Sequence, residues 1–203
     1  HSRVPRGKPL RVSVLLFEDV ELLDVAGPVE VFSKDAAIEV ELLSPDGAPV
    51  TSSQGVTLGV DGVYEAKTGE VLFVPGGMGT RQLVHDQPFL GHLRELSASS
   101  TTLMSVCTGS ALLAAAGLLD GYAATSNKRA FGWAAGLGNK VEWRRASRWV
   151  HDRDRWTSSG VSAGIDMAAA FIADLRGVEA VKEIADAIEL RLNLDPDDDS
   201  FAV

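Results

Sequence analysis

Cys107 is the residue of this 203-residue chain best placed for covalent chemistry, and it is the chain's only cysteine. It follows the apolar residues 103–106 and precedes Thr108-Gly109-Ser110, after which helix-forming residues continue to Ala116. This order predicts a buried strand that turns sharply into a helix, with the sulfur held in the turn as in a nucleophile elbow. The first free amides of that helix would favour the thiolate, so Cys107 is a candidate nucleophile. A buried structural cysteine is the alternative.

A carboxyl group could supply and take up the protons that such a nucleophile needs. Five acidic residues lie near the turn after the first predicted strand: Glu18, Asp19, Glu21, Asp24 and Glu30. Asp24 differs from the others because it stands in the apolar sequence Leu-Leu-Asp-Val-Ala. An acid in such surroundings either caps a helix or turns its carboxyl into a site, and it can do both.

A glycine-rich turn follows another predicted strand, in the sequence Pro-Gly-Gly-Met-Gly. Gly76, Gly77 and Gly79 leave backbone amides uncovered, and such amides can bind an anion or developing negative charge. A plain tight turn is the alternative. A phosphate-binding P-loop is excluded, because the Lys-Ser/Thr pair that should follow is missing.

The remaining residue types form no second catalytic pattern. Four histidines are placed at the terminus, on predicted surface or beside a polar turn: His1, His85, His92 and His151. No histidine directly follows Cys107, and a single cysteine excludes an intrachain disulfide and a multi-cysteine metal site. There is also no dinucleotide-binding fingerprint. We therefore expect neither a metal nor a cofactor.

The predicted elements bring the candidate residues to one edge of a sheet. Strands are predicted at 11–17, 38–43, 71–74, 103–106 and 121–125, with an irregular strand pair within 50–60 and paired strands at 141–150 and 156–158. Helices are predicted at 22–32, 88–97, 127–136, 161–175 and 178–192. This alternation predicts an α/β fold, a mainly parallel sheet sandwiched between helices. Ligands bind beyond the carboxyl ends of such strands, so we expect the turn after Phe17, the glycine-rich turn and Cys107 to converge.

Composition and charge limit the partners. A net charge of −9 argues against a nucleic-acid surface, and the Arg-rich residues 144–155 are diluted by Asp152 and Asp154, so we interpret them as a solvated face or an interface. No apolar run reaches the roughly 18 residues that a membrane helix needs. The N-terminal sequence lacks the apolar core of a signal peptide, and one cysteine suits a reducing cytoplasm. We expect a cytoplasmic protein without membrane or nucleic-acid partners.

The chain contains no repeat and no low-complexity linker, which favours one domain. We place this domain at residues 11–193, after a flexible leader at 1–10 and before an acidic tail at 194–203 that we expect to be loose. Trp143, Trp149 and Trp156 lie in a segment that could line an interface, although core packing would explain them as well.

Four motifs together resemble the ThiJ/PfpI superfamily, the glutamine amidotransferase-like proteins of flavodoxin-type α/β fold. They are residues 15–28 (LLFEDVELLDVAGP), 74–79 (VPGGMG), 105–110 (SVCTGS) and 159–166 (SGVSAGID). The Leu-Asp-x-x-Gly-Pro and Cys-Thr-Gly-Ser patterns look like the isocyanide hydratase branch. They differ from the protease branch, in which histidine follows the cysteine; Thr108 stands there instead.

The resemblance assigns roles to individual residues. It implies that Cys107 is the nucleophile, Asp24 its carboxylate partner and Thr108 a neighbouring hydroxyl, with backbone amides around Gly77 and Thr108 stabilising charge. The residues that it places around the substrate are Gly76, Gly77, Gly79, Ser126, Asn127 and Val161. Related sequences often read Thr-Thr-His where this chain reads Thr125-Ser126-Asn127, so a histidine used by several relatives is missing.

The implied activity is a cofactor-independent hydration of an isocyanide, a small-molecule substrate, to an N-formamide by a homodimeric enzyme. One alternative is a glyoxalase III- or deglycase-like activity on methylglyoxal with the same cysteine. The other is a non-enzymatic redox sensor or small-molecule-binding module in which Cys107 is oxidised or ligated.

Overall fold

A seven-stranded sheet forms the centre of the protein, in a computed structural model that describes residues 9–64 and 67–202. Neighbouring strands are parallel except for one pair at an edge of the sheet, β10 and β11, which is antiparallel. In spatial order the strands are β10 (Trp149–Asp152), β11 (Arg155–Ser158), β7 (Thr102–Val106), β6 (Val71–Val74), β1 (Leu10–Leu15), β2 (Ile38–Ser44) and β5 (Gly62–Val63). The predicted mainly parallel α/β sheet is confirmed.

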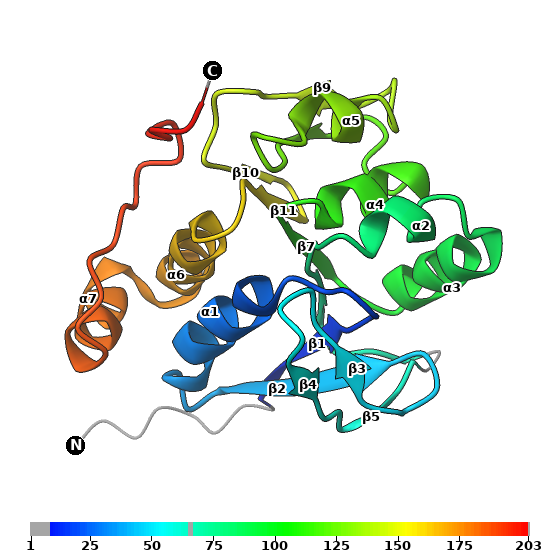
Figure 1. The fold of residues 1–203 in the computed structure, drawn as a ribbon. Helices are drawn as coiled ribbons and strands as arrows, with labels where there is room; N and C mark the ends of the chain where they lie inside the picture. Colours follow the sequence, from blue (N-terminus) through cyan, green and yellow to red (C-terminus); the bar gives the residue numbers. More distant parts are fainter. Residues whose placement is uncertain (1–8, 65–66, 203) are drawn as a thin grey trace.

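Helices cover both faces of this sheet (Figure 1). One face carries α1 (Leu22–Ser33), α6 (Ala163–Arg176) and α7 (Val178–Ala187), and the other carries α2 (Thr80–Leu83), α3 (Gln87–Ala98) and α4 (Gly109–Ala115). Because both faces are covered, the central strands β6 and β7 are almost entirely buried and apolar, as their sequences predict.

Short elements complete the fold. They are the antiparallel pair β3 (Val50–Thr51) and β4 (Thr57–Leu58), the parallel pair β8 (Ala123–Ala124) and β9 (Glu142–Trp143), and helix α5 (Phe131–Ala135). The irregular pair expected within 50–60 is confirmed. The prediction of one strand at 141–150 is wrong, because the structure has two separate strands there. Glu142–Trp143 (β9) pairs with β8, and Trp149–Asp152 (β10) pairs with β11. The helices predicted at 127–136 and 178–192 are shorter in the structure.

Residues 143–156 divide between the surface and the core: Arg144, Arg145 and Arg153 are exposed, as expected for a solvated face. Trp149 and Trp156 are buried in the core, and His151 stacks on Trp156 with ring centroids 3.7 Å apart. Arg148 is half-buried, in an ion pair with Asp166 at 2.8 Å. Since the partner of Arg148 is distant in the sequence, the charge pattern of the segment alone could not identify it.

The acidic tail is not loose. Asn193 donates its backbone N–H to Asp166 (3.1 Å), and the carbonyl of Pro196 accepts a hydrogen bond from the backbone N–H of Arg148 (2.7 Å). The side chain of Asp199 is buried beside Lys128. The expectation overlooked that buried cations of the domain could neutralise tail carboxylates. Of the predicted leader, residues 1–8 lie outside the described part, and Leu10 already belongs to β1.

Candidate active site

Cys107 lies in the turn between β7 and α4, as predicted, with a φ of 58°. This left-handed conformation costs a non-glycine residue about 1–2 kcal/mol and must be held by its surroundings. The hydroxyls of Ser110 and Ser126 both donate to the carbonyl of Cys107, at 3.2 and 3.1 Å. Gly109 lets the turn approach β6, because a Cβ there would lie 2.1 Å from the carbonyl oxygen of Val74. Ser126 therefore supports the turn itself.

The thiol is nearly enclosed, with Cys107 only 5% exposed. Asn127 Nδ2 donates to Cys107 Sγ at 3.1 Å, and Asn127 Oδ1 accepts from the backbone N–H of Ala130 at 3.0 Å, which orients the amide. Gly160 closes the other side: a Cβ at this position would lie 2.2 Å from Asn127 Nδ2 and 3.1 Å from Cys107 Sγ. Val161, next in the chain, is half-buried against the core.

Asp24 is fully buried in the first turn of α1, but it does not cap that helix. Its Oδ2 accepts from the backbone N–H of Gly76 at 2.9 Å, and its Oδ1 has no hydrogen-bond partner among the described residues. Burial raises the pKa of Asp24 to about 8, and the nearby Glu21 carboxylate adds to the rise. The Asp24 and Cys107 side chains interact electrostatically, because the Asp24 carboxylate raises the pKa of the Cys107 thiol. Asp24 therefore holds a proton beside the sulfur at neutral pH.

The thiol of Cys107 is also protonated in the resting site. Burial raises its pKa to about 12, and the Asp24 carboxyl adds to the rise, while hydrogen bonds from Thr108 and Asn127 oppose it. The prediction that helix amides favour the thiolate concerns only one of these effects. The backbone amide of Thr108 does act in the expected direction, but desolvation outweighs it.

The glycine-rich turn contributes close packing rather than free amides. The N–H of Gly76 donates to Asp24, that of Gly77 to Thr108 Oγ1 at 3.0 Å, and that of Gly79 to the carbonyl of Asp19 at 3.2 Å. A Cβ at position 76 would lie 2.6 Å from Thr108 N, and one at position 79 would lie 2.1 Å from the carbonyl oxygen of Glu18. In this arrangement the turn holds Asp24 and Thr108 in place.

Thr80 is a site residue that the sequence analysis missed. Its buried hydroxyl lies 2.7 Å from the carbonyl oxygen of Gly77 and 3.1 Å from Thr108 Oγ1, so it supports the hydroxyl beside the nucleophile. The only sequence signal was its place directly after the glycine-rich turn. Two other acids of the first turn have structural partners: Glu18 accepts from the backbone N–H of Thr51, and Glu21 accepts from the side chain of Gln54.

The remaining candidates stay apart from the thiol. Glu30 pairs with Lys34 on the surface of α1. His92 packs against Tyr64, and His1 lies outside the described residues. Within the described part of the chain there is no group of three or more side chains arranged to hold a metal ion. That part also contains no helix long and apolar enough to span a membrane.

Comparisons with known proteins identify the family of this chain. The sequence matches the DJ-1/PfpI family over residues 10–174. The isonitrile hydratase of Pseudomonas putida is 35% identical over 188 residues, which cover 92% of this chain and 79% of that protein. The transcriptional regulator CdhR of Pseudomonas aeruginosa is 33% identical over 73% of this chain, but the match spans only 44% of the regulator.

Solved structures show the same fold. A ThiJ/PfpI family protein from Pseudomonas syringae superimposes with a TM-score of 0.80 at 29% identity, covering 95% of this chain and 79% of that chain. DJ-1beta of Drosophila melanogaster superimposes with a TM-score of 0.77 at 22% identity, covering 90% and 99% of the two chains. The chain therefore belongs to the DJ-1/PfpI family.

Proposed function

We propose that the protein hydrates an isocyanide, R–N≡C, to the N-formamide, R–NH–CHO, with Cys107 as nucleophile. The observation that carries this proposal is the burial of the Asp24 carboxyl and the Cys107 thiol in one site, where burial favours the protonated form of each. The terminal carbon of an isocyanide must gain both a nucleophile and a proton, and this pair presents both from adjacent groups. The 35% identity to an isonitrile hydratase supports the same reaction, because isonitrile and isocyanide name the same functional group.

The first step adds the thiol across the terminal carbon. Asp24 gives its proton to that carbon while Cys107 Sγ forms a bond to it, and the carboxylate takes up the thiol proton. The product is a thioimidate, R–N=CH–S–Cys107, and Asp24 is protonated again. A pKa of about 8 suits this exchange, because the acid is loaded at neutral pH and its conjugate base still accepts a proton readily.

The second step releases the product. Asp24 protonates the imine nitrogen, water adds to the carbon, and the carboxylate takes up the proton of that water. The tetrahedral carbon then expels Cys107 Sγ, and Asp24 relays the hydroxyl proton to the departing sulfur. The sum of both steps is one isocyanide and one water converted to one N-formamide, with the enzyme unchanged. Hydrogen bonds from Asn127 and the Thr108 amide stabilise the sulfur as it leaves.

Asn127 also favours the hydratase over the methylglyoxal alternative. A primary amide donates a hydrogen bond to the sulfur, but it cannot act as a general base near neutral pH. All proton transfers at the thiol then fall to Asp24. The isocyanide reaction needs one group that alternates between acid and base, and Asp24 meets this need.

The test is a paired assay of the purified protein with an aliphatic isocyanide and with methylglyoxal. We expect formation of the N-formamide, and intact-protein mass spectrometry of quenched reactions should show a thioimidate adduct on wild type and none on Cys107→Ser. Consumption of methylglyoxal alone would support the glyoxalase- or deglycase-like alternative. Turnover of neither substrate would favour the sensor or binding module.

The resemblance also implies a homodimer in the cytoplasm, and we propose both. The exposed apolar side chains available for self-association include Leu23 and Met78, which adjoin Asp24 and Gly77 in the sequence. An interface at these residues would lie close to the site.

A further inference from the structure

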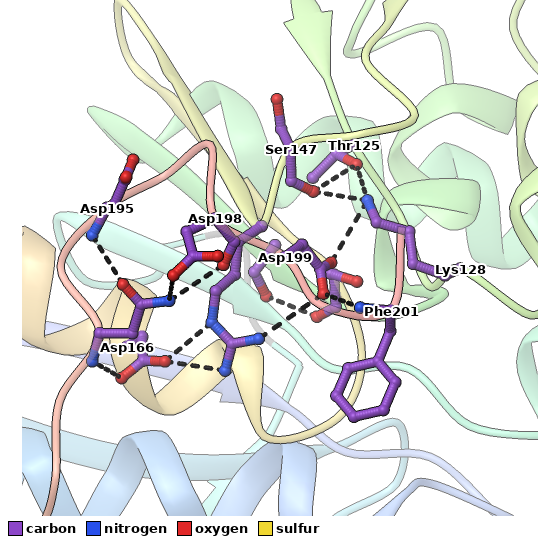
Figure 2. Close-up of polar contacts among 12 residues, drawn as sticks. Thr125, Lys128, Ser147, Asp166, Asp195, Asp198, Asp199 and Phe201 are labelled. Atoms are coloured by element: carbon purple, nitrogen blue, oxygen red, sulfur yellow. Dashed lines mark hydrogen bonds and ion pairs between the residues drawn. The ribbon is translucent and has the colours of Figure 1, made fainter. Parts of the chain in front are cut away.

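The acidic tail lies against the loop that carries Asn127 (Figure 2). Asp199 comes from the tail, and its side chain meets Lys128, which is the residue after Asn127. The Phe201 backbone N–H donates to Asp199 Oδ1 at 3.0 Å, so a turn of the tail orients this carboxylate. The tail is thus anchored beside the loop of the candidate active site, although Asp199 lies far from Cys107 in the sequence.

Two cations and two anions form a buried cluster at this contact. Lys128 and Arg148 supply the positive charges, and Asp166 and Asp199 supply the negative charges. Their side chains are only 1–12% exposed. Arg148 bonds Asp166 through two nitrogens at 2.8 Å and lies 3.9 Å from Asp199. Because Arg148 already has Asp166, the carboxylate of Asp199 is the counter-ion of Lys128, at 3.7 Å.

Lys128 joins the tail to the loop. Besides its ion pair with Asp199, its ammonium donates to Thr125 Oγ1 at 2.9 Å and to the carbonyl of Ser147. Two of the three ammonium protons are thus used in hydrogen bonds, and Asp199 Oδ2 lies at ion-pair distance from the charge. Burial lowers the pKa of Lys128 to about 8, and Asp199 works against this fall. A buried ammonium needs a counter-ion, and Asp199 is the carboxylate nearest to Lys128 that has no closer cation. The ion pair therefore holds the Lys128 side chain, and with it the two hydrogen bonds to the loop, in the observed place.

We infer that Asp199 is a positioning residue for the nucleophile. It holds Lys128 charged and anchored, and the anchored loop presents Asn127 Nδ2 to Cys107 Sγ. This inference rests on the proposed function only in treating Cys107 as the reacting group. It gives the acidic tail a role in setting the hydrogen bond on the sulfur.

The test compares four proteins: wild type, Asp199→Asn, Asn127→Ala and the double variant. Asp199→Asn keeps the shape of the side chain and removes its charge. Loss of a hydrogen bond to a charged sulfur corresponds to about a tenfold change or more, so each single variant should lose about that factor in kcat/KM. Asp199→Asn should add no further loss in the Asn127→Ala background, because the bond through which it acts is already absent.

A second readout does not depend on the substrate. Cys107 is the only cysteine, so its alkylation rate by iodoacetamide reports on this thiol alone. The two single variants and the double variant should all show the same altered rate. This arm keeps the inference testable even if isocyanide hydration is not found, so failure of the proposed function and failure of the inference can be distinguished.

Two further variants separate positioning from general destabilisation. Asp197→Asn removes the same charge from an exposed site two residues away and should leave both readouts at the wild-type level. Asp199→Glu keeps the charge, so its kcat/KM and alkylation rate should lie much closer to the wild-type values than those of Asp199→Asn. If Asp199→Asn does not fold, Asp199→Glu takes its place in the comparison with Asn127→Ala. Its effect on both readouts should then be smaller, and it should again disappear in the Asn127→Ala background. Additive effects of Asp199→Asn and Asn127→Ala, or wild-type values of both readouts in Asp199→Asn, would overturn the inference.

Discussion

Replacing Asp24 by asparagine should stabilise the protein at neutral pH while removing its activity. The folded-state pKa of Asp24 is raised from 3.8 to about 8, so the folded protein binds a proton that the unfolded chain releases between these values. Stability contributed by Asp24 is therefore fully present below pH 3.8, falls as pH rises, and is lost by about pH 8. Asparagine has the same shape and does not titrate.

The magnitude follows from the width of this interval. Between pH 3.8 and pH 7 the Asp24 carboxyl costs the wild type about three units at 1.36 kcal/mol each, or about 4 kcal/mol. Asp24 Oδ1 has no hydrogen-bond partner among the described residues, so the asparagine amide would leave a donor unpaired there, at a cost of about 1–3 kcal/mol. Asp24→Asn should thus be about 1–3 kcal/mol more stable than wild type at pH 7 and less stable in acid.

Urea unfolding of both proteins at a series of pH values measures this difference directly. Other titrating groups cancel in the difference between variant and wild type, and activity should fall by about 10²–10⁴-fold in the variant. A stability difference that stays constant with pH would mean that Asp24 has an ordinary pKa, and the acid would have to be sought elsewhere. Full activity of the variant would refute its role in proton transfer.

The remaining predictions address the nucleophile, its enclosure and the assembly. Cys107→Ala should abolish turnover and keep the wild-type circular dichroism spectrum, since only one sulfur is lost from the turn; residual activity would place the chemistry elsewhere. Gly160→Ala should lower kcat/KM about tenfold or more, because its Cβ would lie 2.2 Å from Asn127 Nδ2 and displace that hydrogen bond from the sulfur, whereas unchanged kinetics would show that the bond is dispensable. Light scattering at micromolar concentration should give twice the 21.5 kDa mass of the chain, and the monomer mass would contradict the proposed homodimer.

Periodicity and chain order were enough to predict how the main parts of the site come together. The apolar runs before Pro75 and Cys107 become the adjacent parallel strands β6 and β7, and the helix after the first turn brings Asp24 to the same edge. This succeeds because strands covered on both faces are recognisable as short apolar runs, and because parallel strands end at a common edge.

The electrostatics of the site could not be predicted in the same way. The helix after Cys107 indicates an activated thiol, but burial raises the thiol pKa, and burial depends on distant residues such as Gly160 closing over the sulfur. The amides of the glycine-rich turn looked free in sequence, yet Asp24 and Thr108 from other elements accept from two of them. Such partners are known only when the fold is known.

The ion pair between Lys128 and Asp199 also constrains how the protein is made. Lys128 is synthesised well before Asp199, so its ammonium has no counter-ion from the tail and is solvated by water while the intervening strands and helices assemble. Burying it in that interval would be costly, which leaves the loop hydrated until the tail has been synthesised and docks. The surroundings of the sulfur are thus completed only after Asp199 has been synthesised, and a nascent chain that has already built its sheet does not yet have a finished reaction centre.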